Sequence, residues 1–243
     1  MTSLVVVLSS TAAHAGPRSQ SGFAGAGGLL LVAEPTVDVV TVRASVLVRG
    51  IDADVSVVYG LKPRGASRTT QVAFPAAVRT VEMDGAKEPA PPWRNVQLLV
   101  DGTAVAHGTS VDRAPIPDAM CGDPPTGMTT GPARGHVVRG RVTLPAGKIT
   151  LVELRFTTTM THDDWRTPDG AWERSERRLC LRLRPLAGYQ GQGMPLVDVE
   201  MRGEQRAVLA PGKRGEDGVW RYQALVVPSG GSGDFLVTLP PPG

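Results

Sequence analysis

Apolar and polar residues alternate along the stretch of residues 37–59. A period of two is typical of an extended strand that buries one face and turns the other toward water. The Asp-Ala-Asp segment at 52–54 interrupts the pattern, which then resumes through Val55, Val57 and Tyr59. We therefore predict a β-hairpin here. The residues expected toward the core are Val40, Val42, Ala44, Val46 and Val48, and those expected toward water are Thr41, Arg43, Ser45 and Arg49.

The rest of the chain also consists of short strand-like segments. Strand-like segments at 69–74, 96–100, 103–107, 136–144, 149–158 and 179–184 are separated by turns rich in Gly and Pro. The chain holds 29 Gly and 21 Pro without a collagen period, and no segment sustains the helical period of 3.6 residues. The sequence therefore predicts an all-β fold, an antiparallel sandwich that is immunoglobulin-like or jelly-roll-like.

The Pro- and Gly-rich stretch at 112–135 carries no periodic pattern. It is typical of a long loop inside one fold or of a linker between two β layers. We therefore expect an N-terminal β half at 16–111 and a C-terminal β half at 136–243, packed together or in tandem. The sequence leaves open whether they form one domain or two.

The first fifteen residues have the features of a signal peptide. An apolar run at 4–8 is followed by Ala13-His14-Ala15, the small-x-small pattern that signal peptidase cleaves. No Lys or Arg precedes the run, which a start codon lying upstream would explain; a buried first strand is the alternative. No later stretch approaches the roughly 18 to 20 apolar residues of a membrane helix. We expect a secreted, periplasmic or cell-envelope protein with no integral membrane segment in its mature chain.

The two cysteines are Cys121, in the Pro/Gly-rich stretch, and Cys180, in an alternating segment. In an exported protein two cysteines usually form a disulfide, and we predict that bond here; two free thiols are the alternative. Cys180 alternates with leucines, so the bond would hold a loop against the polar face of a sheet. No CxxC pair accompanies either residue, so a Cys-based metal site is not expected.

The charge pattern argues against nucleic acid as a partner. The net charge is +3, and its arginines are dispersed among acidic residues rather than gathered on one face with aromatics. Aromatic residues make up only 5% of the chain, so the core must consist mainly of Val, Leu and Ala.

The densest polar cluster is His162, Asp163 and Asp164. A histidine beside two carboxylates can bind a metal or transfer protons, so a metal-dependent or hydrolytic enzyme is one hypothesis. The cluster precedes a Thr-Pro-Asp-Gly turn, however, and we expect a solvated loop. His107 and His136 are expected to be surface or strand-edge residues. Since no Gly-x-Ser-x-Gly or phosphate-loop motif is present, we assign no catalytic residue, metal or cofactor.

Trp165 and Trp172 flank the same turn. Across a hairpin they could face each other and stack on a sugar ring, which makes a carbohydrate-binding module a further hypothesis. The alternative is a packed aromatic pair that supports the turn.

Several segments resemble a family of exported bacterial proteins that carry a domain of unknown function. They are the Gly-Gly-Leu segment at 27–32, the hairpin at 37–59, the Ala-Phe-Pro strand end at 73–75 and the Leu-Pro-Ala-Gly-Lys segment with its following strand at 144–156. The resemblance implies export and a mostly β fold, and it supplies no catalytic residues. We expect an exported protein with a binding or structural role, whose partner is an unidentified protein or glycan. If function is localised, we expect it in the loops at 112–135 and 161–173.

Overall fold

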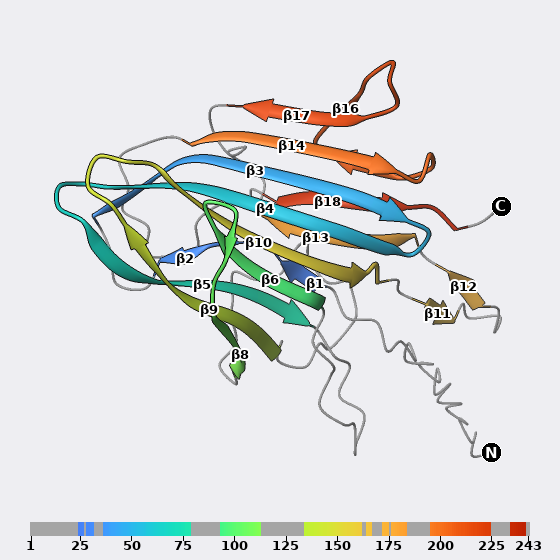
Figure 1. The fold of residues 1–243 in the computed structure, drawn as a ribbon. Helices are drawn as coiled ribbons and strands as arrows, with labels where there is room; N and C mark the ends of the chain where they lie inside the picture. The colour runs from blue at the N-terminus through green and yellow to red at the C-terminus, as the bar shows by residue number, and fades with distance from the viewer. Residues whose placement is uncertain are drawn as a thin grey trace, which may run out of the picture.

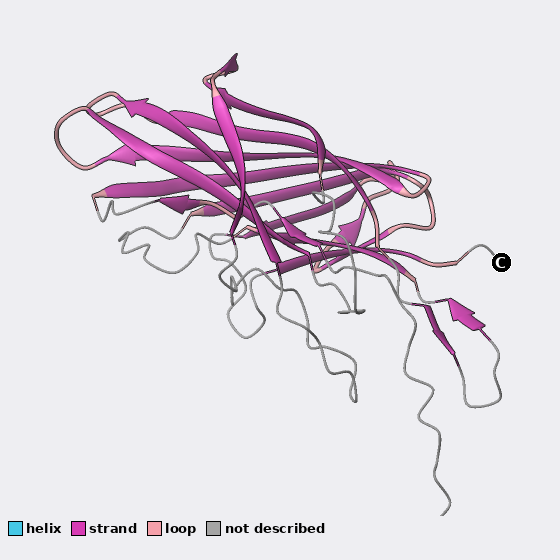
Figure 2. Ribbon diagram, turned by 90° about the horizontal axis from the view of Figure 1, so that it is seen from below, coloured by secondary structure: helices cyan, strands magenta, loops and turns pink. Residues whose placement is uncertain are grey.

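The computed structural model describes residues 24–26, 28–31, 36–78, 93–112, 134–161, 164–166, 172–174, 176–183, 195–224 and 234–241. These residues form strands and connecting loops, with no helix among them (Figure 2). Nothing in this part of the chain forms a helix with the length and apolarity needed to cross a membrane. The segment 1–15 and Cys121 lie outside the described residues, so the signal peptide and the disulfide stay predictions.

Two eight-stranded sheets make up the body of the protein. In sheet A the order is β15 (Val208–Ala210), β18 (Asp234–Leu239), β13 (Arg177–Arg182), β1 (Ala24–Ala26), β5 (Arg68–Val78), β9 (Arg134–Leu144) and β8 (His107–Asp112), with β2 (Leu30–Leu31) beside β5. In sheet B it is β16 (Lys213–Arg214), β17 (Trp220–Ala224), β14 (Leu196–Gly203), β3 (Val37–Arg49), β4 (Asp52–Pro63), β10 (Thr150–Thr159), β6 (Arg94–Val100) and β7 (Thr103–Ala104) (Figure 1).

The all-β sandwich predicted from the sequence is confirmed. Most neighbouring strands are antiparallel, but β1 runs parallel to β13 and β3 runs parallel to β14. A third, two-stranded sheet pairs β11 (Asp164–Arg166) with β12 (Trp172–Arg174). Figures 1 and 2 both place this small hairpin apart from the two large sheets.

The predicted hairpin is β3–β4, with two differences. The turn lies at Gly50 and Ile51, so the segment 52–54 already belongs to β4 and Ala53 is buried. Near the start of β3 the pairing shifts between Val39 and Thr41, which is a β-bulge. As a result Val39 and Val42 are fully buried while Val40 is only partly buried, so the prediction that Val40 faces the core is wrong.

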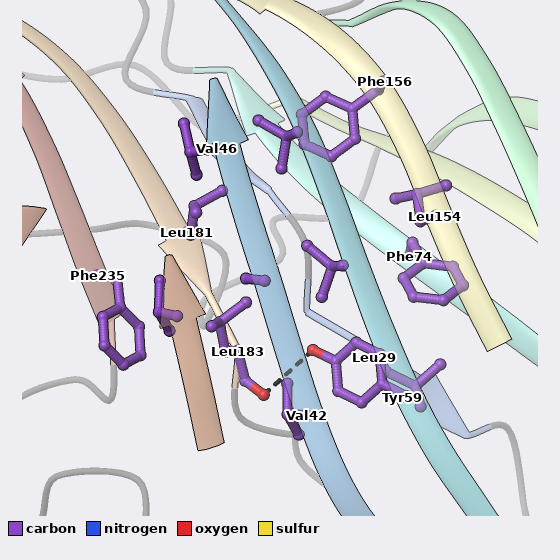
Figure 3. Packing of buried hydrophobic residues seen from close by; sticks show 14 of the residues in the cluster. Leu29, Val42, Val46, Tyr59, Phe74, Leu154, Phe156, Leu181, Leu183 and Phe235 are labelled. Atoms are coloured by element: carbon purple, nitrogen blue, oxygen red, sulfur yellow. Dashed lines mark hydrogen bonds between the residues drawn. The ribbon is translucent and has the colours of Figure 1, made fainter. Parts of the chain in front are cut away.

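One hydrophobic core fills the space between the sheets. Both sheets combine strands from 16–111 with strands from 136–243, so the two expected halves share the sheets and the core. Figure 3 shows Leu29, Tyr59, Phe74, Leu154, Leu183 and Phe235 meeting there. The hydroxyl of Tyr59 donates a hydrogen bond to the carbonyl of Leu183 over 3.1 Å, which ties β4 of sheet B to the end of β13 of sheet A (Figure 3).

Candidate functional site

The structure does not test the predicted metal cluster, which stays a hypothesis. His162 and Asp163 lie outside the described residues, and Asp164 begins β11. His107 is exposed on β8 and pairs with Gly140, four residues along β9 from His136. His136 is buried, because β9 is an inner strand and this position lies beside Ala76 of β5, so the expectation of a surface histidine is wrong. Within the described residues, no three His, Cys, Asp or Glu side chains are grouped as metal ligands would be.

The register of β11–β12 separates the two predicted tryptophans. Trp165 pairs with Glu173, and Trp172 pairs with Arg166. The tryptophans are therefore one position out of register and are not direct cross-strand partners. The carbohydrate-binding hypothesis gains no support from this pairing.

Cys180 alternates with the core leucines of β13, as the sequence predicts, but its face is not exposed. Its side chain is 2% exposed, and that of Arg182, two residues on, is 4% exposed. This face of β13 holds the cysteine and the arginine that the alternation predicts for the more polar side, but it is not open to solvent.

A hollow of the described surface lies elsewhere, on the outer face of sheet B. Two adjoining hollows of about 490 Å³ and about 570 Å³ share Ser45, Ser56 and Glu200, and we call them together the sheet B groove. The polar residues that line it are Arg43, Ser45, Asp54, Ser56, Asn95, Gln97, Arg155, Thr157, Asp198, Glu200, Arg202, Arg221 and Gln223.

The groove follows from the strand register. Ser45 of β3 lies opposite Ser56 of β4, and the row continues to Arg155 on β10 and to Glu200 on β14. Residues paired in register project from the same face of a sheet. Two short serine side chains between long charged ones therefore leave a floor with a wall on each side. The strands that build it lie side by side in Figure 1.

One wall is a hydrogen-bonded ion pair. Arg155 donates to Glu153 through Nε over 2.5 Å and through Nη2 over 3.0 Å, and Ser56 donates to the same carboxylate over 2.6 Å. Partial burial works to raise the pKa of Glu153, but the hydrogen bonds from Arg155 and Ser56 outweigh it and lower that pKa below its usual range. The hydrogen bonds to Glu153 and its negative charge raise the pKa of Arg155. This wall therefore stays charged and fixed at neutral pH.

The other wall is a small charge network. Glu200 pairs with Arg202 over 3.1 Å and with Arg221 over 3.2 Å. Arg221 also pairs with Asp217 over 2.6 Å, and hydrogen bonds from Arg221 lower the pKa of Asp217 to about 2. Three of the groove's four arginines, counting Arg155, are thus held by carboxylates of the protein itself.

Arg43 and Asp198 differ from these residues. They lie side by side in the register of β3 and β14, and both line the larger hollow. In the described part of the chain, neither takes part in an ion pair or a side-chain hydrogen bond. The groove therefore presents one cation and one anion that are not committed to other side chains.

A bulge shapes the far end of the groove. The pairing of β6 with β10 shifts between Arg155 and Thr157, and Asn95 there has a φ of 53°. Asparagine tolerates this left-handed conformation better than most residues, and bulges often redirect side chains at the edge of a site. Here Asn95 and Gln97 both line the smaller hollow.

Sequence reasoning missed this groove. The signal was the row of polar residues on β3, which we interpreted as solvent-exposed surface. Its partners on β14 and β17 are more than 150 positions away along the chain, and no local pattern indicates that β14 lies beside β3.

No protein-family model matches this sequence, and no curated protein matches it. Among solved structures, the chain is similar to a candidate nutrient binding protein from Legionella pneumophila, with a TM-score of 0.61 and 11% identity over 90% of this chain and 71% of that one. An M1 zinc metallopeptidase from Deinococcus radiodurans has a TM-score of 0.37 and 12% identity, and this chain spans 42% of its length. Leukotriene A4 hydrolase from Saccharomyces cerevisiae has a TM-score of 0.39 and 12% identity, with 30% of its length spanned. The likeness to the Legionella protein shows a shared fold, and the resemblance to an exported family stays a prediction.

Proposed function

We propose that this protein is an exported binding protein that holds a small polar solute in the sheet B groove. The observation that carries the proposal is the serine floor between two charged walls. The volumes of its two hollows, about 490 Å³ and about 570 Å³, fall within the range of roughly 300–1,000 Å³ that is usual for small-molecule sites.

The walls are suited to binding because they are already ordered. Glu153 fixes Arg155, and Glu200 and Asp217 fix Arg221, so these side chains lose little freedom when a solute enters. The groove opens to solvent along a sheet face, which favours rapid exchange over permanent retention. These properties fit a protein that captures and releases its ligand.

Two further observations support an exported binding protein. The Legionella protein that shares the fold is itself described as a candidate nutrient binding protein. The signal-peptide pattern at 1–15 and the pair Cys121 and Cys180 fit a location outside the cytoplasm. A captured solute and an exported location belong together in a binding protein of the cell envelope.

The proposal is tested by closing the groove. Ser45→Trp places a large ring on the floor at an exposed position of a central strand. Gln71→Trp makes a similar change on the exposed face of β5 in sheet A and serves as the control. A library of polar metabolites is first screened by the rise in melting temperature, since a ligand that binds only the folded state stabilises it. Hits are then measured by calorimetry.

We expect at least one solute to bind the natural protein and the Gln71→Trp variant equally, and to lose at least tenfold in affinity for Ser45→Trp. A solute that binds all three proteins equally would place the binding site elsewhere and overturn the proposal.

A further inference from the structure

Two charges stand out in the larger hollow of the groove. The neighbouring arginines Arg202 and Arg221 are engaged with Glu200, whereas Arg43 and Asp198 are engaged with no other side chain in the described part of the chain. The pairing of β3 with β14 sets these two residues at adjacent positions. Opposite charges that lie side by side without forming an ion pair are available to a ligand that carries both charges itself.

We infer that the groove selects a zwitterion of the α-amino acid type, with its carboxylate on Arg43 and its ammonium group on Asp198. The inference rests on the binding role proposed above and names the class of solute. In an α-amino acid the two charged groups are attached to the same carbon, so they can contact two side chains on neighbouring strands at once.

The two side chains suit those groups chemically. The planar guanidinium of Arg43 can donate two parallel hydrogen bonds to a carboxylate. The carboxylate of Asp198 accepts hydrogen bonds from an ammonium group. A purely anionic solute would leave Asp198 facing its negative charge, and a purely cationic solute would do the same with Arg43. Both are therefore discriminated against.

The residue across from Arg43 favours a ligand with an apolar part. Val58 of β4 pairs with Arg43 and lines the same hollow. In the row Asp198–Arg43–Val58 this valine lies beside the arginine, and its aliphatic surface can contact the side chain of a small amino acid. The charged residues Glu200 and Arg221 border the hollow on the other side and are already paired.

The test uses four probes on the full chain: L-valine, isovalerate as its acid without the amine, isobutylamine as its amine without the acid, and glucose as a neutral solute. Calorimetry is run on the natural protein and on Arg43→Gln and Asp198→Asn. Arg141→Gln is the matched control, because Arg141 is an exposed arginine on β9 of sheet A. Circular dichroism and the melting temperature confirm that each variant is folded.

We expect L-valine to bind at least tenfold more tightly than either singly charged probe. Each of the two groove variants should weaken L-valine by at least tenfold, and Arg141→Gln should leave it unchanged. Asp198→Asn should also reduce the preference for L-valine over isovalerate, because the ammonium group is then no longer recognised by charge.

The two proposals fail in different ways. If glucose or a singly charged probe binds best and Ser45→Trp abolishes that binding, the groove is a site but the zwitterion inference is wrong. The inference is also overturned if L-valine does not bind the natural protein, or binds it and both charge variants equally. If L-valine binds and Ser45→Trp does not weaken it, the groove itself is refuted as the site.

Discussion

The hydroxyl of Tyr59 gives a sharp test of how the two sheets are joined. Its side chain is fully buried, and its hydroxyl donates to the Leu183 carbonyl over 3.1 Å while accepting a backbone hydrogen bond from Leu29. Burial raises the pKa of Tyr59 far above its usual range, so the hydroxyl is protonated and able to donate at neutral pH. One hydroxyl therefore satisfies two buried backbone groups.

Replacing Tyr59 by Phe keeps the ring and removes both hydrogen bonds. A buried polar group left without a partner costs about 1–3 kcal/mol, and partial relaxation of the two backbone groups lowers the sum. We expect Tyr59→Phe to reduce the free energy of unfolding by about 2–4 kcal/mol. Urea denaturation measures it directly, and an unchanged slope with denaturant would show that both proteins unfold from the same compact state.

Tyr222→Phe is the matched control. Tyr222 packs edge-on against Phe235 at a ring distance of 5.0 Å, and its hydroxyl has no hydrogen-bond partner in the described part of the chain. Its loss should change the free energy of unfolding by less than about 0.5 kcal/mol. If Tyr59→Phe and Tyr222→Phe lower the free energy of unfolding by equally small amounts, the Tyr59 hydroxyl does not hold the sheets together.

Three further predictions concern the backbone, the groove wall and the cysteines. Gly203 has a φ of 108°, and a Cβ there would collide with the Val48 carbonyl, so Gly203→Ala should cost at least about 2 kcal/mol in urea denaturation whereas Gly108→Ala, which has open space, should cost far less. The pKa of Glu153 is lowered in the folded protein, so the ionised carboxylate stabilises the fold fully above about pH 4.5, and this stabilisation is lost as the pH falls through the lowered pKa. The difference in melting temperature between the natural protein and Glu153→Gln should therefore shrink below pH 4.5. A difference that stays constant with pH would contradict this prediction. Reduction of the purified protein should raise its mass by two hydrogens, and two free thiols before reduction would disprove the Cys121–Cys180 bond.

The strands could be predicted because their pattern is local. Alternation along β3, β4, β10 and β13 shows directly which side chains face the core, and the structure buries Val152, Leu154 and Phe156 of β10 as the alternation requires. The same reasoning fails where a single residue is inserted into the pairing. The bulge after Val39 moves Val40 off the core face, and nothing in a valine-rich stretch marks which valine is the extra one.

Burial of polar residues was harder to predict, because it depends on neighbours that are distant in sequence. His136 is polar and begins an alternating segment, which resembles a strand edge, yet β8 and β5 flank it on both sides. Cys180 and Arg182 have the spacing of a solvent face, yet both are covered. Periodicity distinguishes two faces of a strand, but it does not show whether a second layer covers the outer one.

The groove depends on a pairing that the sequence does not reveal. β14 lies parallel to β3 although Thr41 and Leu196, which are bonded across this pair, are 155 residues apart. A slip of β14 by one residue would turn Asp198 and Glu200 toward the core and would bring Val197 and Val199 to the surface. Burial of those valines, both fully enclosed, therefore fixes the register that sets Asp198 beside Arg43. On β14, alternate residues face the core and the groove, so the packing of one set fixes the position of the other. For this reason a substitution that loosens the packing under β14 should weaken solute binding even though it touches no groove residue.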